Sequence, residues 1–528
     1  MLEVIGRVDV PGYELADKAI RLHSGDEVAV LRENLPAGTV LMWEHGDVRL
    51  KQAIPAGHKV ALVPVAEGAA VHKYGQIIGF AAREIRAGDW VHTHNLRIGK
   101  VDTRHVPVSV ADLGEEKANE GGGTFEGYLR PDGRVGTRNY LAIISTVSCS
   151  AETTQMLAAR LREAITREFP YVDGVVPITH SSGCAMGMGS MGYRILQRTL
   201  AGMADHPNVG AAMIIGLGCE TNQAVQLVRE IRGLNAGARG TTKASVPVLG
   251  IQQLGGIRRT VEAGSEVALR LLKQANRARR STQPISQLVI GTNCGGSDAY
   301  SGITANPALG LAGDEMVRRG ATWVLAETPE ICGAEHLLAA RARDPRVAEA
   351  LLERMEWWRK YAAFFGEEIN NNPSYGNKEG GLSTIYEKAL GAVMKAGSSP
   401  LEAVYGYGER ICTRGLCFMD TPGHDQTSVT GLVAGGCTLI AFTTGRGSCL
   451  GFKPAPVLKI ATNTPVFQRM EEDMDLDAGA VLHGLTLKDM GRLIFDELVA
   501  VASGRQTKSE AQGLGDYEFT PWVVGPVL

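Results

Sequence analysis

Apolar runs alternate with helical patterns over residues 140–278, and this alternation limits the fold more than any other feature of the chain. The apolar runs are YLAIISTVSC, VDGVVPITH, GAAMIIGLGCE and VPVLGIQQ, and a stretch with helical periodicity follows each of them. Strands that are buried on both faces lose the alternation of apolar and polar residues and become continuous apolar runs. The pattern therefore predicts a doubly wound α/β domain with a parallel sheet over residues 126–284.

A second set of strand and helix patterns begins near residue 285. Its apolar runs are QLVIGTN, ATWVLAETPE, LIAFTTG and VLKIATNT, and a long amphipathic helix is expected near residues 346–366. Alternation of this kind is typical of helices packed on a mostly parallel sheet. We therefore predict a C-terminal α/β domain over residues 285–528.

The first hundred residues show a different pattern. Short β-type runs such as TVLMWE and HKVALVPV are separated by LPAG, IPAGH, AEGA and IRAGD. Short strands separated by Gly and Pro are typical of an all-β domain, which we place at residues 1–105. The polar, glycine-rich segment that follows predicts a linker over residues 106–125. The predicted fold class is α/β, with a small N-terminal all-β domain joined to two α/β regions.

Composition excludes several classes of function. A net charge of −3 over 528 residues gives no basic surface of the kind that binds nucleic acid. The apolar runs are shorter than the ~20 residues needed to cross a bilayer, and the N-terminus has no apolar targeting segment. The nine cysteines are scattered, which is typical of reduced thiols rather than a disulfide framework. We expect a cytoplasmic protein with no nucleic-acid or membrane partner.

Polar and reactive side chains follow the predicted strands with unusual regularity. In open α/β sheets, ligands bind outside the carboxyl ends of the strands, so these side chains are expected to form a polar pocket. They are His180, Cys219, Glu220, Cys294, Ser297, Asp298, Glu327, Glu330, Thr443, Thr444 and Arg446. Structural interpretations also exist: a cysteine after a strand is often a small buried apolar residue, and Ser297 with Asp298 can cap the next helix.

Histidines in the N-terminal domain suggest a metal site. His92 and His94 stand two residues apart in HTHN, which would place them on one face of a strand, and His23 and His58 lie in other loops. Imidazole ligands suit Fe(II), Mn(II) or Zn(II). The alternative is that the strands hold these side chains apart.

Longer motifs resemble one enzyme family. They are FEGYLRPDGRVGTRNYLAI, IGLGCETNQ, GTNCGGSDAYSGITANPALG, AETPEICGAEHLL, NNPSYGNKEGGLSTIYEKALGAVMKAG and IAFTTGRGS. Together they resemble the altronate/galactarate dehydratase family over nearly the whole chain, and HTHN with AETPEICGAEHLL is closer to the altronate branch. The first hundred residues, with IPAGHKVAL and YGQIIGFA, resemble the family's antifreeze-like (SAF) β domain.

The resemblance implies a hydro-lyase that removes water from a sugar acid and gives a 2-keto-3-deoxy acid. It also implies a divalent metal, Fe(II) by expectation and Mn(II) as the alternative, acting as a Lewis acid on the carboxylate. A base takes the proton α to the carboxylate, and an acid protonates the leaving hydroxyl.

On this resemblance, we assign roles to individual residues as hypotheses. His180 and Lys378 are the acid/base candidates, because the pKa of a histidine, or of a desolvated lysine, can lie near working pH. The metal candidates are His23, His92, His94 and Glu220, with Asp298 as a further ligand. The substrate-binding candidates are Cys294, Ser297, Asp298, Asn377, Thr443, Thr444 and Arg446.

Alternatives stay open at this point. Altronate is the expected substrate, and galactarate, another sugar acid, or sulfolactate, from which a related lyase expels sulfite, are the alternatives. A dehydratase with a [4Fe–4S] cluster would use Cys149, Cys184, Cys219 and Cys294, which all follow predicted strands. A sensor would bind the acid without consuming it. In each case we expect a small-molecule ligand, and we expect a homo-oligomer.

Overall fold

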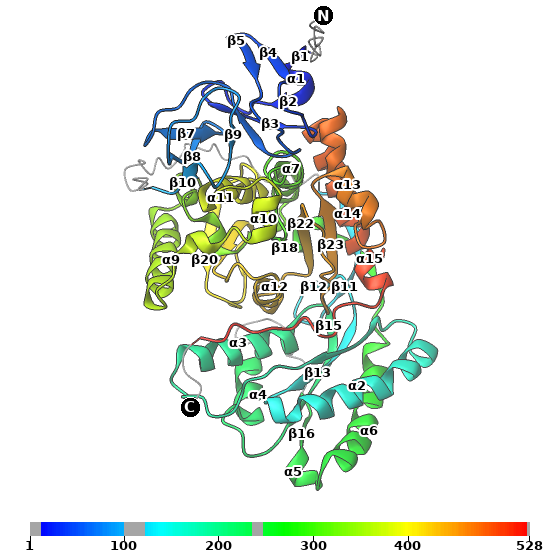
Figure 1. The fold of residues 1–528 in the computed structure, drawn as a ribbon. Coiled ribbons are helices and arrows are strands. Elements are labelled where there is room, and N and C mark those ends of the chain that lie inside the picture. The colour runs from blue at the N-terminus through cyan, green and yellow to red at the C-terminus, as the bar shows by residue number, and fades with distance from the viewer. Residues whose placement is uncertain (1–11, 100–121, 235–245, 525–528) are drawn as a thin grey trace, which may run out of the picture.

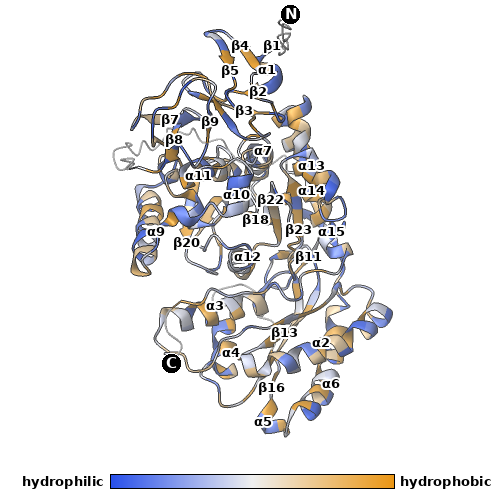
Figure 2. Ribbon diagram, in the orientation of Figure 1, coloured by the Kyte–Doolittle hydropathy of each residue, from blue (hydrophilic) through white to orange (hydrophobic). Residues whose placement is uncertain are grey.

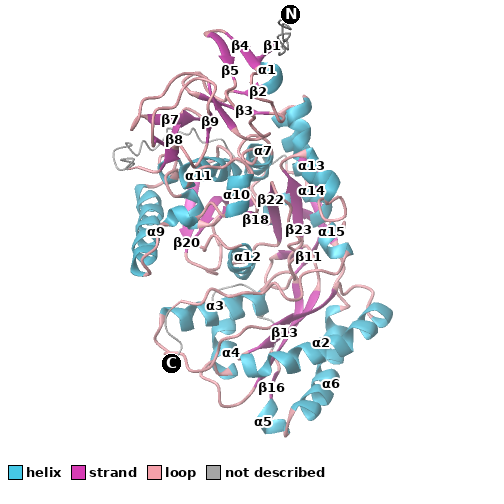
Figure 3. Ribbon diagram, viewed as in Figure 1, coloured by secondary structure: helices cyan, strands magenta, loops and turns pink. Residues whose placement is uncertain are grey.

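The computed structural model describes residues 12–99, 122–234 and 246–524 (Figure 1). An N-terminal group of short strands lies at the top of this view, a larger α/β region in the middle and a smaller α/β region at the bottom. Figure 3 shows that helices flank the strands in both α/β regions. The predicted fold class is therefore confirmed. Residues 106–121 of the predicted linker, which spans 106–125, lie outside the described residues.

The N-terminal region consists of short strands joined by tight turns. Four turns end in a glycine with a φ of 78° to 87°, at Gly38, Gly57, Gly68 and Gly88. Side chains are disfavoured at this φ, which explains why similar turn sequences recur along this region. The elements are β1 (Gly12–Glu14), α1 (Leu15–Lys18), β2 (Ala19–Ile20), β3 (Val28–Leu31), β4 (Val40–Trp43), β5 (Gly46–Arg49), β6 (Lys59–Ala61), β7 (Ala70–Lys73), β8 (Gln76–Ala81), β9 (Trp90–Val91) and β10 (Leu96–Arg97). They form three sheets, in the orders β2-β3-β6-β9, β1-β4-β5 and β10-β8-β7.

The smaller α/β region is a doubly wound parallel sheet in the order β14-β13-β15-β16. Its strands are β13 (Tyr140–Ser145), β14 (Gly174–Ile178), β15 (Val209–Gly216) and β16 (Val248–Gly250), and its helices are α2 (Ser148–Glu168), α3 (Met191–Asp205), α4 (Ala224–Gly233), α5 (Ile251–Leu254) and α6 (Ile257–Ala275). Leu141 and Ile143 pack with α2 and α6, whereas Ala142 and Ile144 pack with α3 and α4. Because both faces of β13 are covered, its sequence is an unbroken apolar run.

The larger α/β region is a seven-stranded parallel sheet in the order β20-β21-β19-β18-β22-β23-β24. The strands are β18 (Val289–Cys294), β19 (Thr322–Leu325), β20 (Leu401–Tyr405), β21 (Gly415–Met419), β22 (Leu439–Thr444), β23 (Val457–Ala461) and β24 (Leu476–Asp477). The helices are α7 (Ala305–Arg318), α8 (Glu335–Ala339), α9 (Pro345–Phe364), α10 (Tyr375–Glu379), α11 (Ile385–Val393), α12 (Asp425–Ala434), α13 (Thr464–Arg469), α14 (Leu487–Ala502) and α15 (Lys508–Ala511). Figure 2 shows apolar residues concentrated on the strands and polar residues on the outer faces of the helices. In the described residues, no helix is both long and apolar enough to span a membrane.

The amino ends of the two parallel sheets meet at the junction between the α/β regions. Asn208, which precedes β15, donates to the carbonyl of Thr438, which precedes β22, over 3.0 Å. His206 Nε2 lies 3.0 Å from the carbonyl of Cys437 beside it. A small antiparallel sheet of β11 (Thr124–Leu129), β12 (Val135–Gly136) and β17 (Ser281–Pro284) completes the junction. The strands of the two sheets therefore run away from each other, and their carboxyl ends lie at opposite sides of the molecule (Figure 1).

Candidate active site

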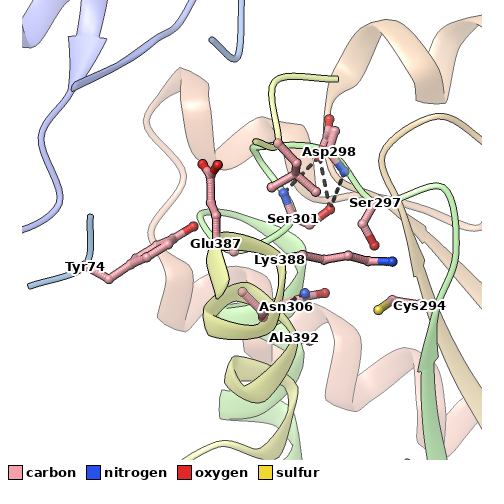
Figure 4. Close-up of a pocket in the computed structure, with 12 residues that line it drawn as sticks. Tyr74, Cys294, Ser297, Asp298, Ser301, Asn306, Glu387, Lys388 and Ala392 are labelled. Carbon is pink, nitrogen blue, oxygen red and sulfur yellow. Dashed lines mark hydrogen bonds between the residues drawn. The ribbon is translucent and has the colours of Figure 1, made fainter. Parts of the chain in front are cut away.

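A small cavity lies at the carboxyl end of β18, under the N-terminal region (Figure 4). Its volume is about 10 Å³, which is room for about one water molecule. The side chains that line it come from β18, the loop after it, α7, the loop before α11, α11 itself and the N-terminal region. They are Tyr74, Cys294, Ser297, Asp298, Ser301, Asn306, Leu382, Glu387, Lys388 and Ala392.

Two glycines after Cys294 let the chain turn into this cavity. A side chain at Gly295 would lie 2.2 Å from the carboxylate of Asp425 and 2.7 Å from Phe442. Gly296 has a φ of 58°, which favours glycine. The pair therefore permits a tight passage between α12 and β22, and it sets Ser297 at the cavity wall. The Ser297 hydroxyl is buried without a hydrogen-bond partner among the described residues.

One thiol and two carboxylates converge at the base of the cavity. Sγ of Cys294 lies 3.3 Å from Oε2 of Glu330, and the Cys294 amide donates to Oε2 of Glu327 over 3.0 Å. Lys395 Nζ lies 2.8 Å from the sulfur and 3.0 Å from Glu327, while Lys388 Nζ lies 2.7 Å from Glu330. In Figure 4 the end of Lys388 lies between Ser297 and Cys294. The result is a buried network of five ionisable groups.

Burial and mutual charge shift the pKa of each group in this network. Burial, with the charge of Glu330, raises the pKa of Glu327 to about 8. Burial also raises the pKa of Cys294. For Glu330 the effect of burial is outweighed by Lys388 and Lys395, so its pKa is lowered. The pKa values of both lysines are raised, because the nearby acidic groups outweigh burial.

These shifts leave two positively charged lysines in the network at neutral pH. Glu327 and Cys294 are then mostly protonated and uncharged, Glu330 is negative, and the two lysines are positive. Asp425, whose pKa is raised to about 6 by burial and by Glu330, adds a second negative charge beside the network at neutral pH, so the charges nearly balance. The two fixed ammonium groups can still bind an anionic group of a ligand, because charges interact more strongly where water is scarce.

The backbone at Glu327 is also unusual. Its φ of 70° and ψ of 63° lie in the left-handed region, directly before the short helix Thr328–Ile331. A non-glycine residue there is strained, and such strain persists where the surroundings hold it. The Thr421 hydroxyl accepts from the Glu327 amide over 2.9 Å, while Oε1 of Glu327 is buried without a partner among the described residues. One carboxylate oxygen is therefore free to bind a ligand.

The N-terminal region closes the cavity through a second buried ionic network. Glu387 on α11 lies 2.8 Å from Nζ of Lys59 and 2.9 Å from Nζ of Lys73, and all three side chains are at most 1% exposed. Tyr74, next to Lys73, forms part of the cavity wall. Because the lysines belong to β6 and β7 and the carboxylate to α11, this network joins the two regions directly above the site.

Comparison with known proteins identifies the family of the chain. Residues 17–99 match the altronate/galactarate dehydratase SAF domain, residues 127–276 the D-galactarate dehydratase/altronate hydrolase second domain, and residues 285–527 the D-galactarate/altronate dehydratase C-terminal domain. The chain belongs to the altronate/galactarate dehydratase family. The resemblance inferred from the motifs, including the SAF domain, is thus confirmed.

Three relatives show how closely the chain follows this family. The altronate dehydratase of Escherichia coli K12 is 37% identical over 494 residues, which cover 93% of this chain and 96% of that enzyme. The galactarate dehydratase (L-threo-forming) of the same organism is 37% identical over 500 residues, covering 94% and 95%. The (2R)-sulfolactate sulfo-lyase subunit beta of Chromohalobacter salexigens is 31% identical over 406 residues, covering 76% and 97%. Overall identity therefore does not distinguish altronate from galactarate.

Most of the predicted substrate-binding residues of this family member lie in or next to the cavity. Cys294, Ser297 and Asp298 line it. Thr443 donates to Asn306 over 2.7 Å, and Asn377 donates to the Ser297 carbonyl over 2.8 Å, so both lie one hydrogen bond behind the wall. On the neighbouring loop, Thr444 accepts from the Gly447 amide, and the half-exposed Arg446 pairs with Glu379.

Asp298 caps the turn that leads into the next helix, which was the structural alternative to ligand binding. Its carboxylate accepts from the amide of Ser301 over 2.9 Å, from Thr462 over 2.9 Å and from Asn463 over 3.0 Å. The Ser301 hydroxyl in turn accepts from the Asp298 amide. Asp298 therefore caps the turn before α7 while it faces the cavity, and its hydrogen bonds hold the loop in place.

The two predicted acid/base residues lie away from the cavity. His180 follows β14 in the smaller sheet, where Nε2 lies 3.1 Å from the Ser145 carbonyl and Nδ1 accepts from the Ser182 amide. Burial lowers its pKa to about 4, so it is neutral near pH 7. Lys378 is half-buried on α10 and does not line the cavity. The sequence could not show that His180 belongs to the sheet edge opposite Cys294.

The predicted metal ligands do not come together. His92 and His94 lie in the turn after β9 rather than on a strand, so the expected shared face does not exist. His92 stacks on Trp90, with its pKa lowered to about 3 by burial and by Lys59, and His23 is exposed and accepts from the Gly25 amide. Glu220 belongs to the smaller α/β region.

Glu220 instead holds its own loop: it accepts from the Thr146 hydroxyl over 2.7 Å and from the amides of Leu217 and Gly218. Within the described residues, the group of three metal-type donors that all lie within 4.8 Å of one another is Cys294, Glu327 and Glu330. This group, rather than the predicted histidine set, is the candidate metal site of the described residues. Sequence reasoning placed Glu327 and Glu330 at a strand end but gave them no role.

The cysteines considered for a [4Fe–4S] cluster are also separated. Cys294 lies at the carboxyl edge of the larger sheet, and Cys149, Cys184 and Cys219 follow strands of the smaller sheet. Because these two edges lie at opposite sides of the molecule, the four thiols of one chain do not meet (Figure 1). A cluster held by all four is thus excluded within a single chain.

Proposed function

We propose that this chain catalyses the dehydration of a sugar acid in the cavity beside Cys294. The observation that carries the proposal is the pair of buried lysines, Lys388 and Lys395, at the carboxyl end of β18. A sugar acid is an anion at neutral pH, and two ammonium groups fixed in a water-poor site suit its carboxylate group. The names of the two Escherichia coli relatives, both sugar-acid dehydratases, support the same reaction.

Dehydration requires stabilisation of the charge that forms when the α-proton leaves. A base takes the proton α to the carboxylate, and the electrons of the broken C–H bond move onto the carboxylate as an ene-diolate. The C–O bond to the β-hydroxyl then breaks as an acid protonates that hydroxyl, which departs as water, and the resulting enol tautomerises to the 2-keto-3-deoxy acid. The ammonium of Lys388 is fixed by Glu330 and by Asn372, 2.6 Å away. A positive group held at the cavity in this way stabilises the ene-diolate without reorganisation. The unpartnered hydroxyl of Ser297 can donate to a substrate oxygen.

We propose further that Cys294, Glu327 and Glu330 hold the divalent metal of this enzyme. The free Oε1 of Glu327 and the convergence of the three donors fit a cation. One sulfur with two carboxylates suits Fe(II), since softer sulfur ligands favour iron over magnesium or calcium. When bound, the metal would act as a Lewis acid toward the substrate carboxylate. A divalent ion that displaces the protons of Cys294 and Glu327 would leave the net charge of the network unchanged.

Metal binding is expected to release protons and to strengthen as pH rises. Cys294 and Glu327 carry protons near pH 7, because the pKa of Cys294 is raised and that of Glu327 is about 8. A cation must replace these protons, so its affinity should increase from pH 6 to above 8. Anaerobic calorimetry with Fe(II) or Mn(II) in buffers of different ionisation enthalpy would measure the release. C294S should lose the metal, and H92A/H94A should keep it; the reverse result would restore the histidine site.

The small volume of the cavity implies that the substrate enters through a movement of its walls. A space of about 10 Å³ holds a water molecule and no sugar acid. Tyr74 from the N-terminal region and α11 form the wall that separates the cavity from the β domain. We propose that the N-terminal region acts as a lid over the site, since closure of such elements excludes water from reactions of this kind.

The substrate is tested by an anaerobic assay of the full chain with Fe(II). We expect a 2-keto-3-deoxy acid to form from altronate. Product from galactarate alone would support the proposed dehydration and place the chain in the galactarate branch of the family instead of the altronate branch. Sulfite released from sulfolactate would favour the sulfo-lyase alternative, for which the match to the sulfolactate enzyme is the supporting observation. If an acid binds and no product forms from any of the three, the sensor alternative is favoured.

The other expectations from the sequence stay predictions. They are the choice of Fe(II) over Mn(II), the cytoplasmic location, the homo-oligomer and the domain boundaries at residues 105, 126 and 285.

A further inference from the structure

Three cysteines gather at the carboxyl edge of the smaller parallel sheet, on the side of the molecule away from the cavity. Cys149 follows β13, Cys184 follows β14 and Cys219 follows β15. The three strands are neighbours, in the order β14-β13-β15, and neighbouring strands lie about 4.8 Å apart. All three thiols are free and exposed. They are thus available to a ligand at this edge.

Hydrogen bonds between the three loops fix the positions of these cysteines. The amide of Ser148, next to Cys149, donates to the Ser182 carbonyl over 2.9 Å. The amide of Asn222 donates to the Gly183 carbonyl over 2.9 Å, directly before Cys184. The loop after β14 is therefore held between the loops after β13 and β15.

Glycine and buried polar side chains make this close approach of the loops possible. A side chain at Gly183, whose φ is 102°, would lie 2.4 Å from the Thr146 carbonyl. Asn222, which is fully buried, donates to that same carbonyl over 2.7 Å. Glu220, next to Cys219, accepts from the Thr146 hydroxyl. The three cysteine loops are one constructed unit rather than three independent turns.

The edge is also the place where a fold of this type binds ligands. The chain leaves β13 through α2 on one face of the sheet and leaves β15 through α4 on the other face. The crevice where the connections diverge in this way is the binding position of doubly wound sheets. Cys149 and Cys219 follow the two strands that flank it. The cysteines therefore lie where the topology directs a ligand.

We propose that Cys149, Cys184 and Cys219 bind a [4Fe–4S] cluster through three thiolates. Each thiolate would bind a different iron atom, which suits three thiols that follow three separate strands. These thiols are not gathered around a single ion: in the described residues, the group of three metal-type donors within 4.8 Å of one another is the one at Cys294. Cys149 lies in the first turn of α2, a helix of 21 residues, and the positive end of this helix stabilises the negative charge of the thiolates.

The smaller α/β region supplies no cysteine ligand for the fourth iron of this cluster. The other six cysteines of the chain all belong to residues 294–449, in the C-terminal region. The fourth iron is therefore open to a small molecule with oxygen donors, such as a hydroxy acid. The inference does not depend on the proposed function of the cavity, because the two sites share no residue.

The test is reconstitution of the full chain with ferrous iron and sulfide under anaerobic conditions. We expect about four acid-labile sulfide per chain, with about four iron in addition to any iron bound at Cys294, and the thiolate-to-iron charge-transfer absorption of such clusters. C149S, C184S and C219S should each lose most of the iron, the sulfide and the absorption. C412S and C449S are matched controls, because these thiols are also exposed. Both variants should keep the iron, the sulfide and the absorption. C294S should keep the cluster as well.

The controls make each outcome decisive. Circular dichroism of the variants checks that they fold, and because the three side chains are exposed, serine should be tolerated. The proposal is overturned if the wild-type chain takes up no sulfide, if it binds a single metal ion without sulfide, or if the triple variant C149S/C184S/C219S retains the cluster. Mössbauer spectra of the wild-type chain and of C184S distinguish the cluster from iron bound at the cavity.

Discussion

Replacing Glu387 with glutamine is expected to destabilise the protein by about 3–5 kcal/mol, the usual cost of removing one partner from a buried ion pair. The Glu387 carboxylate is fully buried and holds Lys59 and Lys73 at 2.8 and 2.9 Å. Without its charge, two buried ammonium groups face each other with no negative partner. The midpoint and slope of urea unfolding would measure the loss.

An exposed carboxylate on a nearby helix provides the control. Glu379 pairs with Arg446 over 3.1 Å, and both side chains are nearly half exposed, so E379Q should cost at most about 1 kcal/mol. The triple variant K59M/K73M/E387L should recover part of the stability, since it removes all three buried charges together. If E387Q and E379Q unfold at the same urea concentration, the network above the cavity has no special role in stability.

The same carboxylate predicts how stability depends on acid. Burial raises the pKa of Glu387, but Lys59 and Lys73 outweigh it and lower the pKa from 4.5 to about 2. A lowered carboxyl pKa adds stability that is complete above the pKa of the unfolded chain and is lost as the pH falls toward the folded value. The unfolding free energy of the wild-type protein should therefore fall between about pH 4.5 and 2, and that of E387Q should fall less over this range.

Replacing Lys388 with methionine is expected to lower kcat by about 10²- to 10³-fold, the usual effect of removing one group that stabilises an oxyanion. The ammonium of Lys388 faces the cavity and is held 2.7 Å from Glu330. Methionine keeps much of the length of the side chain and removes the charge. Initial rates with the active sugar acid would separate the effect on kcat from that on KM.

Two other lysines make this result specific. Lys360 is exposed on α9 and pairs only with a neighbouring carboxylate on the same helix, so K360M should turn over at the wild-type rate. K378M tests Lys378, the acid/base candidate suggested by the sequence, against Lys388 at the cavity. A K378M variant that loses turnover while K388M retains it would move the reaction away from the cavity and toward α10.

The sequence predicted the fold and the residues of the loop at the cavity for a clear physical reason. Strands buried on both faces leave unbroken apolar runs, and the ends of those runs mark where ligands bind. Cys294, Ser297 and Asp298 were found in this way. His180 satisfied the same rule but lies at the edge of the smaller sheet, because a strand end does not reveal which sheet its strand belongs to or which way that sheet faces.

The ionic networks could not be predicted from the pattern. Glu387, Lys388 and Lys395 lie along a helical stretch that is otherwise apolar, which is a signal in hindsight, but a charged residue on a helix is ordinarily exposed. Burial of these groups depends on the N-terminal region packing above α11, a contact between residues more than 300 positions apart. Local sequence carries no record of such a contact.

The meeting of the two sheets at their amino ends gives this molecule two poles. Each pole carries its own set of loops, so substitutions at one pole share no contact with those at the other, and their energetic effects should add. The central junction of hydrogen-bonded strand starts is then a common foundation for both. Selection can reshape the chemistry at one pole, by changing its loops, while the other pole and the foundation stay as they are.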